Sequence, residues 1–535
     1  MALRRRTHSQ SVTRRVFRCD FALHLHYMAG NGLDLDPQLA ALLSETSTEI
    51  DVARKNRVFC NRNLRMDSIE MIGFDMDYTL ALYHQDKLES LSIELTLAKL
   101  IEKHDYPREI LGLTYDPQWA IRGLMVDRKL GNVFKMDRHS YVGRCFHGFR
   151  LLSQDERRAA YGGEKQNFDQ DRFEWIDTLF GLPEVVMYMT LVDWYDSQTA
   201  AGKRPAVDYA VLFHDIRMAI DEAHRDDTLK SVIKANLSSF IVKDPLLAEA
   251  LHKLRSSGKK LFVLTNSLWD YTDAVMSFLL DGERKAYPSW RNYFDLVIVG
   301  GAKPAFFNEQ RPFMQVDGKT GAVSPVDNSK QLFRDKVYQG GNVVEFEQAT
   351  NIRGENCLYI GDHIYGDILR LRKQHMWRTA MVLQELEREI AVSDRMDGQI
   401  RDLDLLDRRN RNLESEVDFQ SLRLKKIQRF LDDDTLAAST RIKLDDERKK
   451  TRESIDALRD RAALMTTEVD ALEARLERGY NPHWGSCLRE GNENSRFGEQ
   501  VNNYADLYTS RVSNFAPYSP LRYFRAPRRP MPHEI

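Results

Sequence analysis

The sequence predicts an α/β fold with a parallel sheet, an inserted cap domain and a long helical extension. Three observations lead to this prediction. Four short apolar segments are each followed by small polar or charged residues, as expected of buried parallel strands that end at a binding site. A mixed, aromatic-rich stretch separates the first of these segments from the other three. Residues 384–478 contain no proline and, apart from Gly398, no glycine.

Length and composition favour a soluble protein of several domains. The 535 residues correspond to roughly three domains. Charged residues make up 30% of the chain and the formal net charge is only −2, so nothing in the composition points to nucleic acid. The nearest approach to a membrane span, residues 179–194, contains Pro183, Glu184 and Asp193 and is not expected to cross a bilayer.

Cysteine usage and the first residues bear on the compartment. The five cysteines are scattered and never form a Cys-x-x-Cys pair, which argues against a zinc site or a disulfide framework and favours a reducing, cytoplasmic location. Residues 1–50 begin with many arginines and no acid before Asp20. This composition fits either an organelle transit peptide or a disordered basic arm, and we favour the arm.

The first strand end carries two carboxylates. Residues 69–72 form an apolar run, and the following loop contains Asp75 and Asp77, two positions apart. Ligands bind outside the carboxyl ends of the strands in an open α/β sheet, so we expect both carboxylates at the floor of a site. Apolar spacing predicts a helix over residues 89–104. Together these elements form the first part of the core, residues 51–110.

Residues 111–230 are predicted to form the cap, because turn glycines and aromatic residues replace the strand pattern there. A helix over residues 215–224 would place Arg217, Asp221 and His224 on one face, at positions i, i+4 and i+7. From this spacing alone, a solvated face with an Arg–Asp pair is the preferred interpretation.

The second part of the core, residues 231–390, supplies three more strand ends. A strand over 260–264 leads to Thr265, Asn266 and Ser267, whose hydroxyl and backbone N–H groups can hold a phosphate or merely cap the next helix. A strand over 295–299 leads to a loop with Lys303. A strand over 357–360 leads to a loop whose two acids, Asp362 and Asp367, stand five residues apart.

In order, these strand ends carry Asp-x-Asp, Thr, Lys and Asp-x4-Asp, and in this the chain resembles the haloacid-dehalogenase-like (HAD) phosphatases. Longer motifs resemble the cytosolic purine 5′-nucleotidases of the IMP/GMP-preferring type, over about residues 55–390 and 484–535. The resemblance implies a HAD-like Rossmannoid sheet with a cap, in a bacterial-like relative that carries an extended coiled-coil insert. The matching motifs include residues 57–62, 74–81, 122–124, 178–184, 289–295 and 361–368.

The resemblance implies a chemical role for each motif residue. Asp75 would attack phosphorus and form an aspartyl-phosphate, and Asp77 would act as general acid and then as general base. Thr265 and Lys303 would bind the transferring phosphoryl oxygens. Mg²⁺ is the expected cofactor, because a hard cation offsets the repulsion between carboxylates and phosphate. Its implied ligands are the Asp75 carboxylate, the Asp77 backbone carbonyl and Asp362, with Asp367 supporting the site.

The resemblance also changes the interpretation of the helix over residues 215–224. Arg217 and Asp221 would recognise a 6-oxopurine edge, since arginine can donate to O6 and N7 and a carboxylate can accept from N1–H. Phe180 and His224 would stack on the ring, and Lys230 would lie near the phosphate. The expected substrate-binding residues are therefore Phe180, Arg217, Asp221, His224, Lys230, Asn266 and Ser267. Gly181 stands where the family has a polar residue, and residues 167–177 match its effector site poorly, which leaves base preference and allosteric activation open.

Residues 391–480 are predicted to form a coiled-coil hairpin of two long helices. Apolar residues from Ile455 to Leu476 alternate at +3 and +4, which is an a/d seam of about three heptads, and residues 432–435 should break the helix. Packing against the core and subunit assembly are both open, and the tetramers implied by the resemblance favour assembly. The tail, residues 481–535, interleaves arginines with aromatic residues, and the resemblance implies that it packs on the core or at a subunit interface.

The function expected from the sequence is Mg²⁺-dependent hydrolysis of purine nucleoside 5′-monophosphates, with IMP and GMP preferred. Transfer of the phosphoryl group to a nucleoside is chemically open, because the implied intermediate is covalent. The expected partners are the nucleotide and further copies of the chain, as a dimer or tetramer, without nucleic acid or membrane. Two alternatives are a HAD phosphatase acting on another phosphorylated metabolite and a coiled-coil assembly protein with a vestigial phosphatase core.

Overall fold

A computed structural model describes residues 52–162, 168, 171–326, 331–369 and 371–534. The expected basic arm or targeting segment, residues 1–50, lies outside the described residues. In the described part of the chain, ten strands form one mixed sheet in the order β1-β20-β17-β16-β3-β11-β12-β15-β13-β14. The strands from β20 to β15 run parallel, whereas β1, β13 and β14 are antiparallel to their neighbours. The expected mixed α/β class is therefore confirmed.

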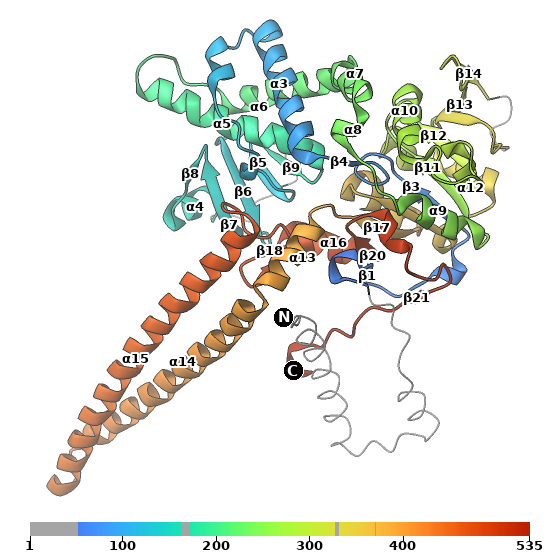
Figure 1. Cartoon of the computed structure of the whole chain (residues 1–535). Coiled ribbons are helices and arrows are strands. Elements are labelled where there is room, and N and C mark those ends of the chain that lie inside the picture. The colour runs from blue at the N-terminus through green and yellow to red at the C-terminus, as the bar shows by residue number, and fades with distance from the viewer. Residues whose placement is uncertain (1–51, 163–167, 169–170, 327–330, 370, 535) are drawn as a thin grey trace, which may run out of the picture. The chain divides into compact units, whose positions relative to one another are not determined.

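The strands of this sheet come from the whole length of the described chain (Figure 1). The bounds of the parallel strands are β3 Met71–Phe74, β11 Lys260–Leu264, β12 Leu296–Val299, β15 Val337–Gly340, β16 Cys357–Gly361, β17 Arg378–Val382 and β20 Leu507–Thr509. The edge strands are β1 Phe59–Cys60, β13 Phe313–Val316 and β14 Val323–Pro325. Between and beside them lie helices α9 Leu247–Ser256, α10 Trp269–Leu280, α11 Ala305–Asn308 and α12 Val343–Thr350.

Strand β3 lies between β16 and β11, and all four of its residues are buried. Its apolar composition fits a strand that is covered on both faces. Gly73 is required by packing, because a Cβ atom there would lie 2.2 Å from the Phe262 ring of β11. The central position of β3 places the residues that follow it, Asp75 and Asp77, at the middle of the sheet's carboxyl edge.

A second, antiparallel sheet of five strands is formed within the described residues 124–176, in the order β8-β7-β6-β5-β9. The chain leaves the main sheet through β4 (Leu82–Tyr83) and returns through β10 (Ile241–Val242), and these two strands pair with each other. Helix α3 (Gln85–Lys103) packs against α5 and α6 of this inserted region (Figure 1). The other elements of the inserted region are β5 Leu124–Asp127, β6 Asn132–Met136, β7 Val142–His147, β8 Arg150–Leu151, β9 Phe173–Ile176, α4 Gln154–Tyr161, α5 Leu182–Ala200, α6 Tyr209–Arg225, α7 Thr228–Ala235 and α8 Leu237–Phe240.

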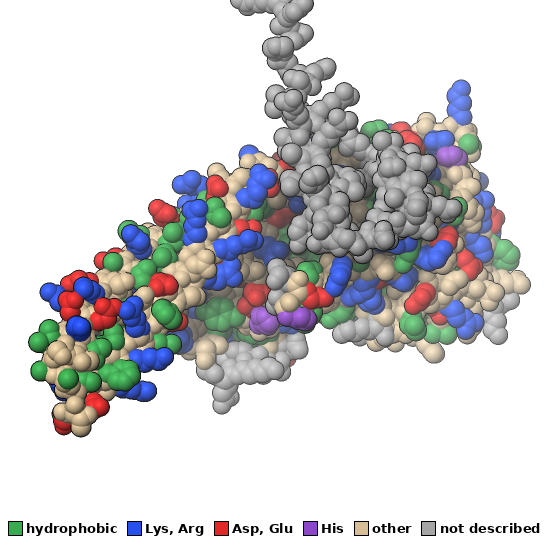
Figure 2. All heavy atoms as spheres, turned by 90° about the horizontal axis from the view of Figure 1, so that it is seen from below, with side chains coloured by type: hydrophobic (Ala, Val, Ile, Leu, Met, Phe, Trp, Pro, Cys, Tyr) green, Lys and Arg blue, Asp and Glu red, His purple; other side chains and the backbone are tan. Residues whose placement is uncertain are grey.

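Two long helices follow the short helix α13 (Leu386–Arg395). Helix α14 (Asp397–Leu431) is joined by a short turn to α15 (Ala438–Tyr480), which packs along it (Figure 1). Asn410 of α14 donates from Nδ2 to Thr466 Oγ1 of α15 at 3.2 Å. Hydrophobic side chains lie exposed among charged ones along these helices (Figure 2). They include Phe419, Leu422, Phe430, Ile442 and Leu464.

The C-terminal residues return to both sheets. Strand β20 pairs with β17 and β1, and the buried Asp506 before it accepts hydrogen bonds from Arg372 and Arg378. Lys135 of the second sheet donates from Nζ to the backbone oxygens of Trp484 and Ser486, each at 2.8 Å. The remaining elements here are α16 Arg496–Tyr504, the pair β18 Arg489–Glu490 and β19 Glu493–Asn494, and β21 Tyr523–Phe524, which pairs with β2 Leu64–Arg65.

Among the described residues, no helix has both the length and the apolar character that crossing a membrane requires. The stretch at residues 179–194, discussed above, contributes instead to the short helical turn η5 (Leu179–Gly181) and to α5. Within α5, residues Leu182–Val192 are buried, so its apolar run is explained by packing inside the fold.

Candidate active site

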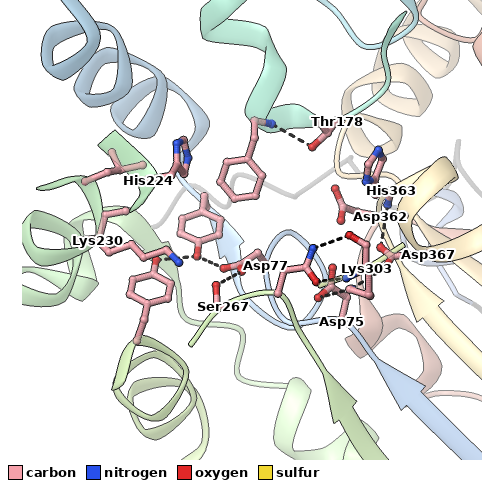
Figure 3. Close-up of a pocket in the computed structure, with 17 residues that line it drawn as sticks. Asp75, Asp77, Thr178, His224, Lys230, Ser267, Lys303, Asp362, His363 and Asp367 are labelled. Carbon is pink, nitrogen blue, oxygen red and sulfur yellow. Dashed lines mark hydrogen bonds and ion pairs between the residues drawn. The ribbon is translucent and has the colours of Figure 1, made fainter. Parts of the chain in front are cut away.

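The loops after four neighbouring strands meet at one cavity of about 230 Å³ (Figure 3). Strands β16, β3, β11 and β12 are adjacent and parallel, so their carboxyl ends lie at the same edge of the sheet. Each strand end contributes polar side chains to the cavity lining. These are Asp75 and Asp77 after β3, Asn266 and Ser267 after β11, Lys303 after β12, and Asp362, His363 and Asp367 after β16.

The loops are held by local hydrogen bonds. Asp75 donates its backbone N–H to Ile360 of β16 at 2.9 Å, and its Oδ1 accepts from the next backbone N–H at 2.7 Å. Asn266 accepts from the Lys303 backbone N–H at 2.6 Å and donates to the Lys303 carbonyl at 3.0 Å. Asn266 therefore ties the loop after β11 to the loop after β12, and this fixes the backbone from which the Lys303 side chain extends.

Lys303 is buried between two carboxylates. Its Nζ lies 2.9 Å from Asp75 Oδ1 and 2.6 Å from Asp367 Oδ1, and it also donates to the Tyr359 hydroxyl at 3.0 Å. Burial opposes the charged form of Lys303, but Asp367 and Asp75 hold its pKa well above the usual value. Burial raises the pKa of Asp75 well above its usual value, with Lys303 acting in the opposite direction. Lys303 is therefore a fixed positive charge beside Asp75.

Asp75, Asp362 and Asp367 form an acidic cluster that fits a hard divalent cation. One carboxylate oxygen from each lies within 4.8 Å of the others, and all three residues are buried. Burial raises the pKa of Asp362 to about 7, although Arg122 opposes this shift. Asp362 Oδ2 has no hydrogen-bond partner among the described residues. The three carboxylates face the Lys303 ammonium and the Arg122 guanidinium, which lies 3.8 Å from Asp362 Oδ2 but is also paired with Glu385, and oxygen ligands of this kind suit a hard divalent cation such as Mg²⁺.

Both carboxylate oxygens of Asp77 are engaged. The Tyr83 hydroxyl donates to Oδ1 at 2.6 Å, and the Ser267 hydroxyl donates to Oδ2 at 2.7 Å (Figure 3). The Tyr83 hydroxyl also lies 2.9 Å from that of Tyr271. Thr265 is fully buried, does not line the cavity, and accepts from the Ser267 backbone N–H at 3.1 Å. Thr265 and Ser267 thus organise the floor of the cavity beneath Asp77.

The opposite side of the cavity is lined by Phe180, His224 and Lys230 from the inserted region. The rings of Phe180 and His224 are 5.8 Å apart at 87°, so they meet edge to face. Burial lowers the pKa of His224, which favours its neutral form. The Lys230 ammonium lies 5.2 Å from the centre of the Tyr271 ring. Aromatic rings and one cation therefore line the cavity on this side.

Arg217 and Asp221 do not line this cavity. Arg217 donates from Nε to Glu184 Oε1 at 2.6 Å and from Nη2 to Glu174 Oε1 at 3.1 Å, while Asp221 is exposed. Burial raises the pKa of Glu184 to about 8, although its partner Arg217 acts in the opposite direction. Of the eleven residues proposed from the sequence for catalysis, metal binding or substrate binding outside the Asp362 loop, only Thr265, Arg217 and Asp221 lie outside the lining.

Two links between the inserted region and the loop after β16 were not predicted from the sequence. Arg122, just before β5, is buried; it donates to the Asp362 backbone oxygen at 2.8 Å and pairs with Glu385 at 2.5 Å through both Nε and Nη2. His363 pairs with Asp177, just after β9, at 2.9 Å, and against the effect of burial this raises its pKa to about 9. Both residues stand inside matching motifs, but nothing in the sequence shows what they contact.

Tyr83, Tyr271 and Thr178 also line the cavity and were not predicted. Tyr83 follows the Asp-x-Asp motif by six residues, and Tyr271 lies in α10. Thr178 begins the turn η5, where its hydroxyl oxygen accepts from the Phe180 backbone N–H at 3.3 Å. Hydroxyl-bearing residues near a motif are common, so only the three-dimensional arrangement distinguishes these three.

Comparison with known proteins agrees with this arrangement. The model of the 5′ nucleotidase family matches residues 58–535. A 5′-nucleotidase domain-containing protein of Dictyostelium discoideum is 28% identical over 485 residues, which cover 89% of this chain and 75% of that protein. The 5′-nucleotidase domain-containing protein 2 of Rattus norvegicus is 28% identical over 513 residues, which cover 94% and 82% respectively. The chain therefore belongs to the 5′ nucleotidase family and is a hydrolase of that class.

Proposed function

We propose that this hydrolase is a Mg²⁺-dependent phosphatase of the HAD type that acts on purine nucleoside 5′-monophosphates, with IMP and GMP preferred. One observation carries the proposal: Asp75 and Asp77 emerge from the central strand into the same cavity as Lys303, Asp362 and Asp367. In a member of the 5′ nucleotidase family, this set supplies a nucleophile, a proton donor, a fixed cation and metal ligands.

In the first step, a carboxylate oxygen of Asp75 attacks phosphorus, and the bond from phosphorus to the nucleoside oxygen breaks. Asp77 transfers its proton to the leaving oxygen, so the nucleoside departs as a neutral alcohol. In the second step, the Asp77 carboxylate takes a proton from water, whose oxygen attacks the aspartyl-phosphate. The bond from phosphorus to Asp75 breaks, phosphate is released, and Asp77 is protonated again.

Lys303 remains charged throughout, because its pKa is held high by Asp367 and Asp75. Its ammonium, 2.9 Å from Asp75, favours the negative charge that develops on the phosphoryl oxygens. Thr265 is proposed to act with it on these oxygens. Mg²⁺ held by Asp75, Asp362, Asp367 and the Asp77 backbone carbonyl would supply further positive charge when bound.

The base is proposed to lie against Phe180 and His224, with Lys230, Asn266 and Ser267 toward the phosphate. Recognition of the 6-oxopurine edge is assigned to Arg217 and Asp221. These two lie outside the cavity lining, so this assignment requires Arg217 to exchange Glu184 for the base. The same covalent intermediate would allow transfer of the phosphoryl group to a nucleoside.

The other parts of the chain are assigned accordingly. The inserted region acts as a HAD-type cap, and the helices α14 and α15 form a coiled-coil hairpin that serves assembly into a dimer or tetramer. The proposed location is the cytoplasm. Free cysteines are consistent with it: Cys60, Cys145, Cys357 and Cys487 form no disulfide among the described residues.

Phosphate release with Mg²⁺ from IMP, GMP, AMP, CMP and several sugar phosphates tests the proposal, with Asp75→Asn as the control. We expect release from IMP and GMP well above AMP, and its loss in Asp75→Asn by a factor of about 10⁴ or more. Release from non-nucleotide substrates alone would keep the chemistry and replace the substrate class. Release from none of them would reject the enzyme proposal and favour an assembly role.

A further inference from the structure

The Tyr83 hydroxyl is the middle member of a hydrogen-bonded chain that runs from Tyr271 to Asp77. Tyr271 Oη lies 2.9 Å from Tyr83 Oη, which lies 2.6 Å from Asp77 Oδ1. A tyrosine hydroxyl has a single proton. Because Tyr83 donates this proton to Asp77, the proton in its hydrogen bond with Tyr271 must come from Tyr271. The donors therefore run in one direction, from Tyr271 to Tyr83 to Asp77. Together with Ser267 on Oδ2, Tyr83 fixes the plane of the Asp77 carboxyl group.

The position of Tyr83 is itself fixed. Its backbone pairs with Ile241 of β10, and its carbonyl accepts from Gln384 Nε2 at 3.0 Å. The side chain is 1% exposed, and its ring packs 5.0 Å from that of Tyr78. A hydroxyl held this firmly restricts the rotation of the carboxyl group that it contacts.

Orientation matters because Asp77 must deliver a proton along one direction. With Oδ1 bonded to Tyr83 and Oδ2 to Ser267, each carboxyl oxygen retains one further lone pair, and Asp77 lines the cavity. A proton carried on such a free position can pass to the leaving oxygen without breaking either hydrogen bond. Loss of the Tyr83 bond would free the carboxyl group to rotate and reduce the fraction of aligned encounters.

We propose that Tyr83, supported by Tyr271, is a positioning residue that orients Asp77 for proton donation to the leaving oxygen. The inference rests on the proposed function, because it requires the two-step phosphatase chemistry. Tyr83 acts through Asp77 and needs no contact with the substrate. The effect of losing its hydroxyl must therefore depend on how much the leaving group needs a proton.

The test compares first-turnover release of the leaving group from IMP and from 4-nitrophenyl phosphate, in wild type and Tyr83→Phe. Inosine leaves as an alcohol and needs the proton, whereas 4-nitrophenolate is stable as an anion. We expect Tyr83→Phe to slow release from IMP about tenfold or more and release from 4-nitrophenyl phosphate less than about twofold. Tyr271→Phe should change the same ratio in the same direction by a smaller factor.

The ratio of the two rates in one preparation does not depend on the folded fraction, so partial misfolding cannot produce the result. Tyr188→Phe is the matched control, because Tyr188 is also buried and its hydroxyl has no hydrogen-bond partner among the described residues. Equal slowing of both substrates, or of neither, would overturn the role of Tyr83 and leave the proposed function intact. A wild-type protein that releases neither leaving group would overturn both.

Discussion

The two ends of the cavity are built differently. At the proposed phosphate end, formed by Asp75, Lys303, Asp362 and Asp367, short loops after adjacent strands bring the charged groups close to one another. The proposed base end is lined by Phe180 and His224, and Arg217 and Asp221, which are assigned to base recognition, also come from the inserted region but do not line the cavity. Arg217 is paired with two carboxylates outside it.

This difference has a physical cause. The aspartates have only two rotatable side-chain bonds and follow strands whose register fixes them, and the longer Lys303 side chain is held between two of these aspartates, so the proposed phosphate end is arranged before any substrate binds. An arginine on a helix reaches far and takes the nearest available carboxylate, here Glu184 and Glu174. We therefore expect the side chains at the phosphate end to keep their positions when substrate binds, and Arg217, which is assigned to base recognition, to move.

The largest effect expected in the comparison is that of Lys303→Met. This change removes the fixed charge between Asp75 and Asp367 and keeps most of the length of the side chain. We expect kcat to fall about 10²–10³-fold for every phosphate ester, because the loss affects the developing phosphoryl charge and not the leaving group. Steady-state kinetics with IMP and 4-nitrophenyl phosphate measure it.

Lys203→Met, at an exposed lysine away from the cavity, is the control for this prediction. If Lys303→Met loses activity on IMP but retains it on 4-nitrophenyl phosphate, Lys303 belongs to substrate recognition, and the proposed division between the two ends fails.

Arg217→Ala should have a smaller effect that depends on the substrate. If Arg217 reads the purine edge, kcat/KM for IMP falls about 10–100-fold, because the base loses its hydrogen-bond donor. Cleavage of 4-nitrophenyl phosphate should stay within about twofold. Arg225→Ala on the same helix is the matched control, since Arg225 is exposed and, within the described part of the chain, its side chain donates a hydrogen bond only to the Asp221 backbone oxygen. Equal loss on both substrates, or on neither, would remove the base-reading assignment.

The sequence predicts the strand-end residues of the phosphate end better than the contacts of the base end. The strand over 260–264 coincides with β11, and the polar residues after four apolar runs do meet at one edge of the sheet. These predictions succeed because a buried parallel strand has a distinctive composition and its end a defined place. The pairing of Arg217 with Glu184 could not be predicted, because it depends on two helices, α5 and α6, packing side by side.

The antiparallel sheet of the inserted region and the addition of β20 to the main sheet were also not predicted. Strands β5 to β9 carry polar residues such as Asp127 and Lys135 at buried positions, which obscures their apolar pattern. These residues are satisfied by distant partners: Arg172 binds Asp127, and three backbone oxygens of the tail, including that of Trp484, bind Lys135. Only partners brought together by folding show why such charges can be buried.

The smallest expected effect is a pH-dependent change in stability that comes from Glu184, the hydrogen-bond partner of Arg217. Burial raises the pKa of Glu184 to about 8, whereas an unfolded glutamate titrates near about 4.3. The folded state thus binds this proton more tightly than the unfolded state. The stability that results is fully present below about pH 4 and is lost as the pH rises to about 8. Above that pH the ionised Glu184 holds Arg217 most firmly.

Glu184→Gln removes this titration and leaves a side chain of similar shape. Between pH 6 and pH 8.5 the wild type should therefore lose about 2 kcal/mol of unfolding free energy more than the variant, a relative fall of a few degrees in the thermal midpoint. Differential scanning calorimetry at both pH values measures it, with Glu174→Gln, at the other and more exposed partner of Arg217, as the control. Parallel pH curves for wild type and Glu184→Gln would show that Glu184 is ionised throughout. The restraint that Glu184 places on Arg217 would then not change with pH over this range.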